Sequence, residues 1–274
     1  PGLGAVQLMV TLVLLTPAYL ARLWWRGRNE PVYRKRLRER LGWYELPPRR
    51  GQGGVVWIHA VSLGETRAAA PLVQALRREL PEMRLLLTCS TATGVQAGLD
   101  LLQPEDDQAW FPYDSPGAVR RFFKRNRPAV GVIMETEIWP NVMHRAQAMH
   151  VPMVLANARL SQRSQRKGRR FAWLLRPALA SFERVLAQTA RDAQRLREAG
   201  AQRIEVSGNT KFDITPSAKH LVRGHEWRTQ LARAVVLMAS SREGEEDPLF
   251  AAWQSLPAPR PLLLVVPRHP QRFD

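Results

Sequence analysis

The chain has 274 residues, of which 45% are hydrophobic and 24% are charged, so a packed core is possible and an intrinsically disordered chain is excluded. Lysine and arginine number 41 against 24 aspartates and glutamates, a formal net charge of +17. That excess indicates an anionic partner (nucleic acid, anionic lipid or a phosphorylated substrate), with an arginine-rich proteome as the alternative explanation. The single cysteine, Cys89, excludes an internal disulfide and fits a reducing compartment.

An apolar segment without a charged residue runs from Leu3 to Leu20. A helix of roughly 20 apolar residues matches the hydrocarbon core of a bilayer. Two tryptophans and a run of arginines follow, so the positive-inside rule places the remaining chain in the cytoplasm. We expect a membrane anchor over residues 1–23 and a basic juxtamembrane helix and linker over residues 24–53. A cleaved signal peptide, a helix lying flat on the membrane and a helix buried in a core are the alternatives.

Short apolar runs alternate with helical patterns from residue 54 onward. Helices of ten or more residues between strands are typical of βαβ units and a parallel sheet. We therefore predict an α/β fold with a Rossmann-like domain over residues 54–212, a linker or interdomain helix over 213–233 and part of a second such domain over 234–274. The expected strands of the first domain are residues 55–62, 83–90, 108–113, 129–137, 151–158, 182–189 and 203–208.

Ligands of such folds bind beyond the carboxyl ends of the strands, and the first strand is followed by a serine, a glycine and a glutamate. Ser62 and Glu65 have the spacing of a helix capping box, which favours a structural role. In the functional interpretation, Gly64 lets a substrate approach the turn and Glu65 acts as a general base, since a helix N-terminus stabilises the carboxylate anion. We expect His59 to be a buried core residue.

Two further strands deliver polar residues to the same edge. Thr91 and Thr93 lie in a hydroxyl-rich turn that either caps the next helix or binds a phosphate or a sugar hydroxyl. Glu135 and Glu137 are spaced so that both would point the same way in a strand. They bind sugar hydroxyls or hold a nearby lysine or arginine; alternatively, one is exposed and the other is ion-paired.

Basic residues are dense between residues 159 and 176, beside bulky apolar side chains. Such a helix can lie on an anionic membrane or bind lipid phosphates, with a solvated charged face as the alternative. After the last strand of the first domain, Asn209 precedes Lys211, whose ammonium would neutralise a phosphate or a sugar carboxylate.

The region predicted to form the second domain offers polar residues at two places. Ser241, Arg242 and Glu243 are expected to open a helix whose N-terminus is suited to a phosphate, although the acidic run also compensates the helix dipole. Pro267 and Arg268 end the last predicted strand. The sequence has no GxGxxG motif after a strand, no P-loop and no cysteine–histidine metal set.

The order of the segments resembles the Kdo (3-deoxy-D-manno-octulosonic acid) transferase family. After the hydrophobic segment come HAVSLGE, TCSTATG, METEIWPN, NARLSQRS, GNTKFD, SREGEE and VPRHPQRF. The resemblance implies a GT-B glycosyltransferase, in which two Rossmann-like domains face each other. It also implies inverting transfer of Kdo from CMP-Kdo to lipid IVA, a lipid A precursor, without metal or cofactor, at the cytoplasmic face of the inner membrane.

The resemblance also assigns roles to residues. It makes Glu65 the general base, Glu135 and Lys211 supports of the transition state, and Pro267 and Arg268 part of the CMP site. The other residues expected to bind substrate are Ser62, Gly64, Thr91, Thr93, Glu137, Asn209, Ser241, Arg242 and Glu243.

Members of this family continue beyond the length of this chain, so we expect a C-terminally truncated second domain and no turnover by the chain alone. Anionic inner-membrane lipids are expected partners. Nucleic acid is not, because carboxylates at strand ends repel phosphates. The alternatives are another GT-B enzyme with a different nucleotide-sugar donor, and a basic membrane-anchored protein that binds anionic lipid or nucleic acid with a steep salt dependence.

Overall fold

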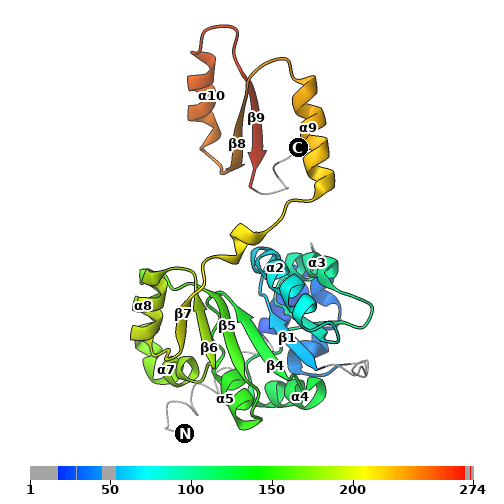
Figure 1. Ribbon diagram of the computed structural model, residues 1–274, viewed down its shortest axis with the longest axis vertical. Helices are drawn as coiled ribbons and strands as arrows, with labels where there is room; N and C mark the ends of the chain where they lie inside the picture. Colours follow the sequence, from blue (N-terminus) through cyan, green and yellow to red (C-terminus); the bar gives the residue numbers. More distant parts are fainter. Residues whose placement is uncertain (1–17, 29, 45–53, 269–271, 273–274) are drawn as a thin grey trace. The chain divides into compact units, whose positions relative to one another are not determined.

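The computed structural model describes residues 18–28, 30–44, 54–268 and 272, and its main elements are drawn in Figure 1. The chain divides into two compact units, one ending at Ile214 and the other beginning at Thr215. The first contains a seven-stranded sheet and the second contains a two-stranded sheet.

The seven strands of the first unit are all parallel and lie in the order β3-β2-β1-β4-β5-β6-β7. Each overlaps a predicted strand, and the inner strands are largely apolar because helices cover both of their faces. The strands are β1 (Val55–His59), β2 (Arg84–Cys89), β3 (Asp107–Trp110), β4 (Val130–Met134), β5 (Met153–Ala158), β6 (Arg184–Ala187) and β7 (Ile204–Val206).

Helices and short 3-10 turns connect these strands. The α-helices are α2 (Leu63–Glu79), α3 (Ala92–Gly98), α4 (Pro116–Asn126), α5 (Pro140–Ala148), α6 (Gln162–Gly168), α7 (Ala172–Ala180) and α8 (Ala190–Ala199). The 3-10 helices are η1 (Pro31–Arg34), η2 (Leu37–Leu41), η3 (Leu99–Leu101), η4 (Arg169–Phe171) and η5 (Thr210–Asp213). The basic region between residues 159 and 176, expected to be helical, is therefore divided among α6, η4 and the start of α7.

The sheet separates two hydrophobic cores. Trp57 of β1 packs in a core with residues of α4, α5, α7 and α8, whereas its neighbour Ile58 packs in a core with residues of α2 and α3. Adjacent strand residues point to opposite faces, so one strand serves both cores. The result is a three-layer α/β arrangement, as the alternating pattern predicts.

The strand order reverses between β1 and β4. The chain moves outward from β1 through β2 to β3, and then returns to place β4 on the other side of β1. The connections leaving β1 and β4 therefore diverge above the carboxyl ends of these two strands. Such a switch point is where ligands of open α/β sheets bind.

The segment before β1 differs from the basic juxtamembrane helix that we expected within residues 24–53. Residues 18–26 are helical, and two 3-10 helices follow, η1 and η2. Arg36 interrupts them with a left-handed φ of 54°. The Glu39 carboxylate then accepts a hydrogen bond from the backbone N–H of Trp110, so the segment follows the edge strand β3 rather than forming one helix.

The predicted membrane anchor lies mostly outside the described residues. Within the described part of the chain, no helix is both long and apolar enough to cross a bilayer.

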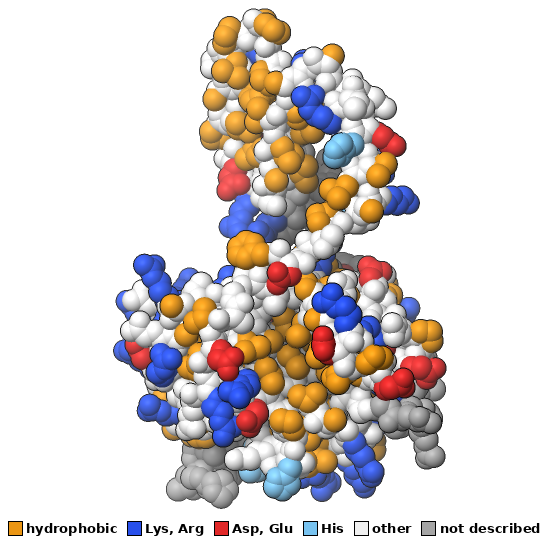
Figure 2. Space-filling model, in the orientation of Figure 1, with side chains coloured by type: hydrophobic (Ala, Val, Ile, Leu, Met, Phe, Trp, Pro, Cys, Tyr) orange, Lys and Arg blue, Asp and Glu red, His pale blue; other side chains and the backbone are white. Residues whose placement is uncertain are grey.

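The second unit consists of α9 (Ala218–Gln230), β8 (Val235–Ser241), α10 (Glu246–Gln254) and β9 (Leu262–Pro267), with β8 and β9 parallel. Helix α9 falls in the stretch predicted as a linker or interdomain helix. Hydrophobic side chains gather on the visible surface of this unit (Figure 2). Leu237, for example, is 57% exposed.

The predicted serine-capped helix is wrong. Ser241 ends β8 and is buried, and α10 begins only at Glu246. A turn intervenes, in which the Glu245 carboxylate accepts a hydrogen bond of 2.8 Å from the backbone N–H of Arg242 and Gly244 adopts a φ of 85°. Strand β8 extends to Ser241 because its residues, Ser241 included, pair with β9, so the serine does not open the following helix.

Candidate active site at the carboxyl edge of the sheet

The turn after β1 is fixed by the turn after β2. The Val61 carbonyl oxygen accepts hydrogen bonds from the backbone N–H of Ser90 and of Thr91 and from the Thr91 hydroxyl, at 3.0–3.1 Å. The Thr91 Oγ1 accepts in turn from the Gly94 N–H at 3.1 Å, so Thr91 caps α3 as one of the two interpretations predicted. Thr93 places its hydroxyl 3.4 Å from that of Thr91. This network positions the first turn of α2.

Glu65 lies in that first turn with its carboxylate directed back to the loop. Oε2 accepts a hydrogen bond of 2.8 Å from the Val61 N–H, and Oε1 accepts one of 3.2 Å from the Ser62 hydroxyl. Ser62 makes no side-chain cap to the helix, so the reciprocal capping box is not formed. The Ser62 hydroxyl instead orients the Glu65 carboxylate. A Cβ placed on the neighbouring Gly64 would meet no atom within 4 Å, so the surface at this turn is open.

Burial raises the pKa of Glu65 from its ordinary value of 4.5 to about 7. Glu135 and Glu137 raise this pKa further, while the hydrogen bonds from Val61 and Ser62 lower it. We expected the helix N-terminus to keep the carboxylate ionised; desolvation and like charges outweigh that effect. A carboxyl group with a pKa near neutrality is well matched to taking a proton from an alcohol.

Glu135 follows β4 and faces Lys211. Its Oε1 lies 2.8 Å from Lys211 Nζ, and the Glu135 side chain is 17% exposed. The residue has a left-handed φ of 60° and donates its N–H to the Ala156 carbonyl oxygen at 2.9 Å. Left-handed backbone at a non-glycine residue is costly and concentrates at functional sites. The prediction that a lysine or arginine is held here is confirmed.

The prediction that Glu135 and Glu137 point the same way because they lie in a strand is wrong. Strand β4 ends at Met134, so both residues lie in the following turn, where the alternation of a strand does not apply. They are nevertheless close, because Glu135 raises the pKa of Glu137, second only to burial. Glu135 and Glu137 of this turn and Glu65 of α2 therefore lie close to one another.

Asn157 of β5 is a site residue that sequence reasoning missed. It is fully buried with a left-handed φ of 53°, and it lies where the register of β5 and β6 shifts. Its Oδ1 accepts a hydrogen bond of 3.1 Å from the Thr210 N–H, which attaches η5, and hence Lys211, to the sheet edge. Asn209 accepts from the Lys211 N–H at 3.0 Å and caps η5. A carboxamide inside the apolar run of β5 was the available signal for Asn157.

The loop that carries Glu137 leads into α5, whose first turn is held by Asp114. This buried carboxylate accepts hydrogen bonds from the backbone N–H of Val142 at 2.9 Å and of Asn141 at 3.2 Å. Trp139, the residue at the cap position, supplies no side-chain cap. Asp114 therefore takes the role of the cap from another loop.

A cavity of about 330 Å³ adjoins Glu137. Thr136, Glu137 and Ile138 form one wall, and α6, α7 and α8 form the rest. Its lining includes the apolar side chains of Leu160, Leu175 and Leu179 and the charged side chains of Arg169, Arg176 and Glu198. This combination suits an amphipathic ligand.

His59 has a structural role, as predicted. It is fully buried, its Nδ1 lies 3.0 Å from both the carbonyl oxygen and the hydroxyl of Thr88, and its ring stacks on Phe111. Burial lowers the pKa of His59 to about 3, so the ring is neutral. Among the described residues, no three histidine, cysteine, aspartate or glutamate side chains are placed to hold a metal ion.

In the second unit, the predicted residues meet at the carboxyl ends of β8 and β9. Ser241 pairs in register with Pro267, and the Arg268 N–H donates to the Ser241 carbonyl oxygen at 3.0 Å. Arg242 and Glu243 follow in the turn after β8. These residues therefore share one edge of their sheet.

A seven-stranded parallel sheet with its polar residues at the strand switch point defines a Rossmann-like α/β domain. Solved structures agree with this fold at low sequence identity. A UDP-GlcNAc 2-epimerase from Neisseria meningitidis bound to UDP-GlcNAc is 14% identical with a TM-score of 0.56, over 77% of this chain and 64% of that one. The S. aureus MnaA–UDP structure is 14% identical with a TM-score of 0.51, over 80% and 64%.

Sequence relatives identify the family. A family model for 3-deoxy-D-manno-octulosonic-acid transferase matches residues 35–214. The 3-deoxy-D-manno-octulosonic acid transferase of Bordetella pertussis is 46% identical and that of Haemophilus influenzae is 32% identical, each over 96% of this chain. The chain belongs to the Kdo transferase family. It spans 64% and 63% of the lengths of these two relatives.

Proposed function

We propose that the whole protein transfers Kdo, with inversion, from CMP-Kdo to a hydroxyl of the lipid A precursor lipid IVA, and that Glu65 is the general base. The observation that carries this proposal is the position of the Glu65 carboxyl group. It lies at the strand switch point, next to an open glycine turn, with a pKa raised to about 7 by burial.

In the proposed reaction, the acceptor hydroxyl gives its proton to the Glu65 carboxylate while its oxygen attacks the anomeric carbon of Kdo. The bond between that carbon and the phosphate oxygen of CMP breaks, and CMP leaves with the bonding electrons. The hydrogen bonds from Val61 and Ser62 hold the carboxylate in one orientation. Attack on the face opposite the leaving group inverts the anomeric centre.

Lys211 is proposed to stabilise negative charge that develops at the reacting groups. The Glu135 carboxylate holds its ammonium at 2.8 Å, and Asn157 holds the turn from which it extends. Lys211 is 41% exposed, so its remaining N–H donors are accessible to a substrate. A preorganised cation of this kind stabilises a transition state more than a mobile one does.

For the acceptor, the cavity beside Glu137 is the proposed site of an apolar portion. Its leucines would contact an acyl chain, while Arg169 and Arg176 at its border would face the phosphates of a glycolipid. This placement sets the hydroxyl-bearing sugar near the turn that carries the carboxylates. Ser62, Gly64, Thr91 and Thr93 would line the opposite side of the acceptor.

For the donor, the carboxyl edge of β8 and β9 is the proposed CMP site, with contributions from Ser241, Arg242, Glu243, Pro267 and Arg268. The carboxyl ends of parallel strands are the usual place for a nucleotide in this class of fold. We propose no metal or cofactor. We further propose that the protein works at the cytoplasmic face of the inner membrane, held by residues 1–23 and by anionic lipids; the net charge of +17 supports that location.

The proposal is tested by expressing the complete gene and incubating the protein with a tetraacylated lipid A precursor and CMP-Kdo, with the product read by mass. We expect the mass of at least one Kdo unit to be added, and Glu65→Gln to lower the rate by roughly 10²–10⁴-fold. Glu79→Gln, at the exposed end of the same helix, is the matched control and should keep full activity.

If Glu65→Gln still forms product at the wild-type rate, Kdo transfer remains the reaction but Glu65 is not its base. No product from a folded wild-type protein with intact CMP-Kdo would reject the proposed donor or acceptor. UDP-sugars would then be tried as donors, since other GT-B enzymes use them.

A further inference from the structure

A strongly basic groove lies on the helices of the first unit, in a part of the domain that the proposed reaction does not use. It has a volume of about 660 Å³ and is lined by α4, α5 and the residues that follow η2. Helix α4 begins after β3 and ends just before β4, so its last turn lies toward the amino ends of the strands. The Glu65 turn lies at the carboxyl ends. The cationic side chains of the groove are Arg120, Arg121, Lys124, Arg125 and Arg145.

Among the described residues, no carboxylate lines this groove and no ion pair involves any of its five cations. The Nε atoms of Arg125 and Arg145 are buried and have no hydrogen-bond acceptor among the described residues. Arginines elsewhere in the fold, such as Arg77 and Arg84, are ion-paired with aspartates. The groove thus concentrates positive charge and leaves buried donors for a ligand to satisfy.

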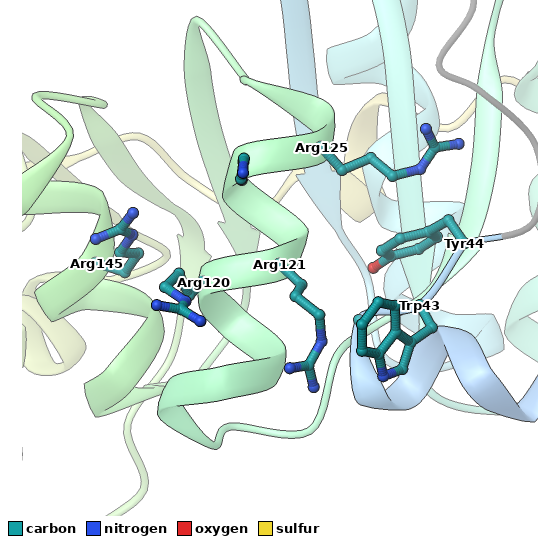
Figure 3. Close-up of a pocket in the computed structure, with 8 residues that line it drawn as sticks. Trp43, Tyr44, Arg120, Arg121, Arg125 and Arg145 are labelled. Carbon is teal, nitrogen blue, oxygen red and sulfur yellow. The ribbon is translucent and has the colours of Figure 1, made fainter.

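Two aromatic side chains form the other wall. Arg121 and Arg125 point from α4 toward Trp43 and Tyr44, with their guanidinium carbons 4.6 Å and 5.4 Å from the ring centroids (Figure 3). Arg121 also donates to a backbone carbonyl of η2, at 2.9 Å from Nε. The Tyr44 hydroxyl is buried and has no partner among the described residues. These contacts preorganise the wall.

The chemistry of the lining selects the ligand. Its side chains offer ammonium, guanidinium, phenol O–H and indole N–H donors, and no carboxylate or carboxamide that would read a nucleobase or a sugar hydroxyl. A phosphate group, which only accepts hydrogen bonds when ionised, matches such a set. Trp43 lines the groove and is 58% exposed. Exposed indole side chains favour the interface between a membrane and water.

We propose that this groove binds the phosphate of an anionic lipid headgroup, separately from the acceptor lipid. This proposal gives a site to the anionic lipids of the proposed function, and it rests on that function in placing the protein at a membrane. Arg120 of α4 and Arg145 of α5, which both line the groove (Figure 3), would contact the phosphate, and Trp43 would enter the headgroup layer. The groove would then orient the first unit on the lipid surface.

The test compares two double variants of the full chain that lose the same charge. Arg120→Gln/Lys124→Gln changes exposed groove residues, and Arg191→Gln/Arg197→Gln changes exposed arginines of α8. Binding is measured by co-sedimentation with vesicles of phosphatidylcholine, with and without phosphatidic acid. Because each basic residue at an anionic surface contributes roughly a factor of five, we expect the groove variant to lose about 30-fold of the preference for phosphatidic acid, and the α8 variant less than about 3-fold.

Equal losses in the two variants, or no loss in the groove variant, would overturn the proposal. So would a wild type that binds both kinds of vesicle equally. Titration with inorganic phosphate alone distinguishes a lipid headgroup from a free phosphate ion as the ligand. If the groove variant loses phosphate binding but keeps the wild-type preference for phosphatidic acid vesicles, the groove is a site for free anions and not for lipid. Turnover on detergent-solubilised acceptor should be unchanged in the groove variant, so failure of the reaction and failure of the lipid site are distinguishable.

Discussion

The Glu65→Gln substitution should make the protein more stable at alkaline pH while it removes the proposed base. A carboxyl group whose pKa is higher in the folded state than in the unfolded state binds its proton more tightly when folded. The stability from this proton is fully present below the ordinary value of 4.5, and it is lost as the pH rises through about 7. Glutamine resembles the protonated carboxyl group at every pH, so the variant does not suffer this loss.

The size of the effect follows from the shift. A change of the pKa from 4.5 to about 7 corresponds to an upper limit of roughly 3 kcal/mol. The carboxyl group is partly exposed, and solvent screening reduces this figure to about 1–2 kcal/mol. We therefore expect the two proteins to be equally stable near pH 4.5 and the variant to be more stable by about 1–2 kcal/mol above about pH 8.

Urea unfolding of both proteins over this pH range measures the difference directly, and Glu79→Gln controls for the loss of one negative charge from the same helix. Parallel stability curves for wild type and Glu65→Gln would show that the folded protein does not raise the pKa of this carboxyl group. The pKa of Glu65 would then not lie near neutrality, and Glu65 would not be suited to act as the base, whatever the activity of the variant.

Four further substitutions test function at Lys211 and Gly64 and stability at Gly98 and Asp114. Lys211→Met should cost less than about 1 kcal/mol of unfolding free energy, because its ion pair with Glu135 is partly exposed, yet lower the turnover of the complete protein by about 10²-fold; unchanged turnover would remove Lys211 from the site. Gly64→Ala should keep the stability within about 1 kcal/mol and slow turnover, whereas Gly98→Ala, whose Cβ would clash with the side chains of Gln108 and Leu87, should destabilise by about 1–3 kcal/mol. Asp114→Ala should cost about 1–3 kcal/mol in denaturant unfolding, and a loss under 0.5 kcal/mol would contradict its capping role.

The inner strands of the first unit, such as β1, β2 and β4, could be predicted from the sequence because they are buried on both faces and therefore largely apolar. The bounds of helix α4 are also visible in the sequence, because Pro116 suits a first turn and the apolar residues that follow repeat at helical spacing. The kind of helix before β1 could not be predicted. Its conformation depends on Glu39 bonding to a strand more than 70 residues away, and nothing local encodes that contact.

At the site, the sequence by itself placed Glu65, Glu135 and Lys211 at strand ends, because the carboxyl ends of parallel strands share one edge. Only the tertiary structure decided what these groups do to one another. The desolvation that raises the pKa of Glu65 comes from the surrounding fold, and the salt bridge to Lys211 closes over 76 residues of chain. Asn157 was missed because its importance lies in the turn that it holds. Local pattern determines which residues reach the edge, but burial and long-range contact set their protonation and partners, since both depend on atoms distant in sequence.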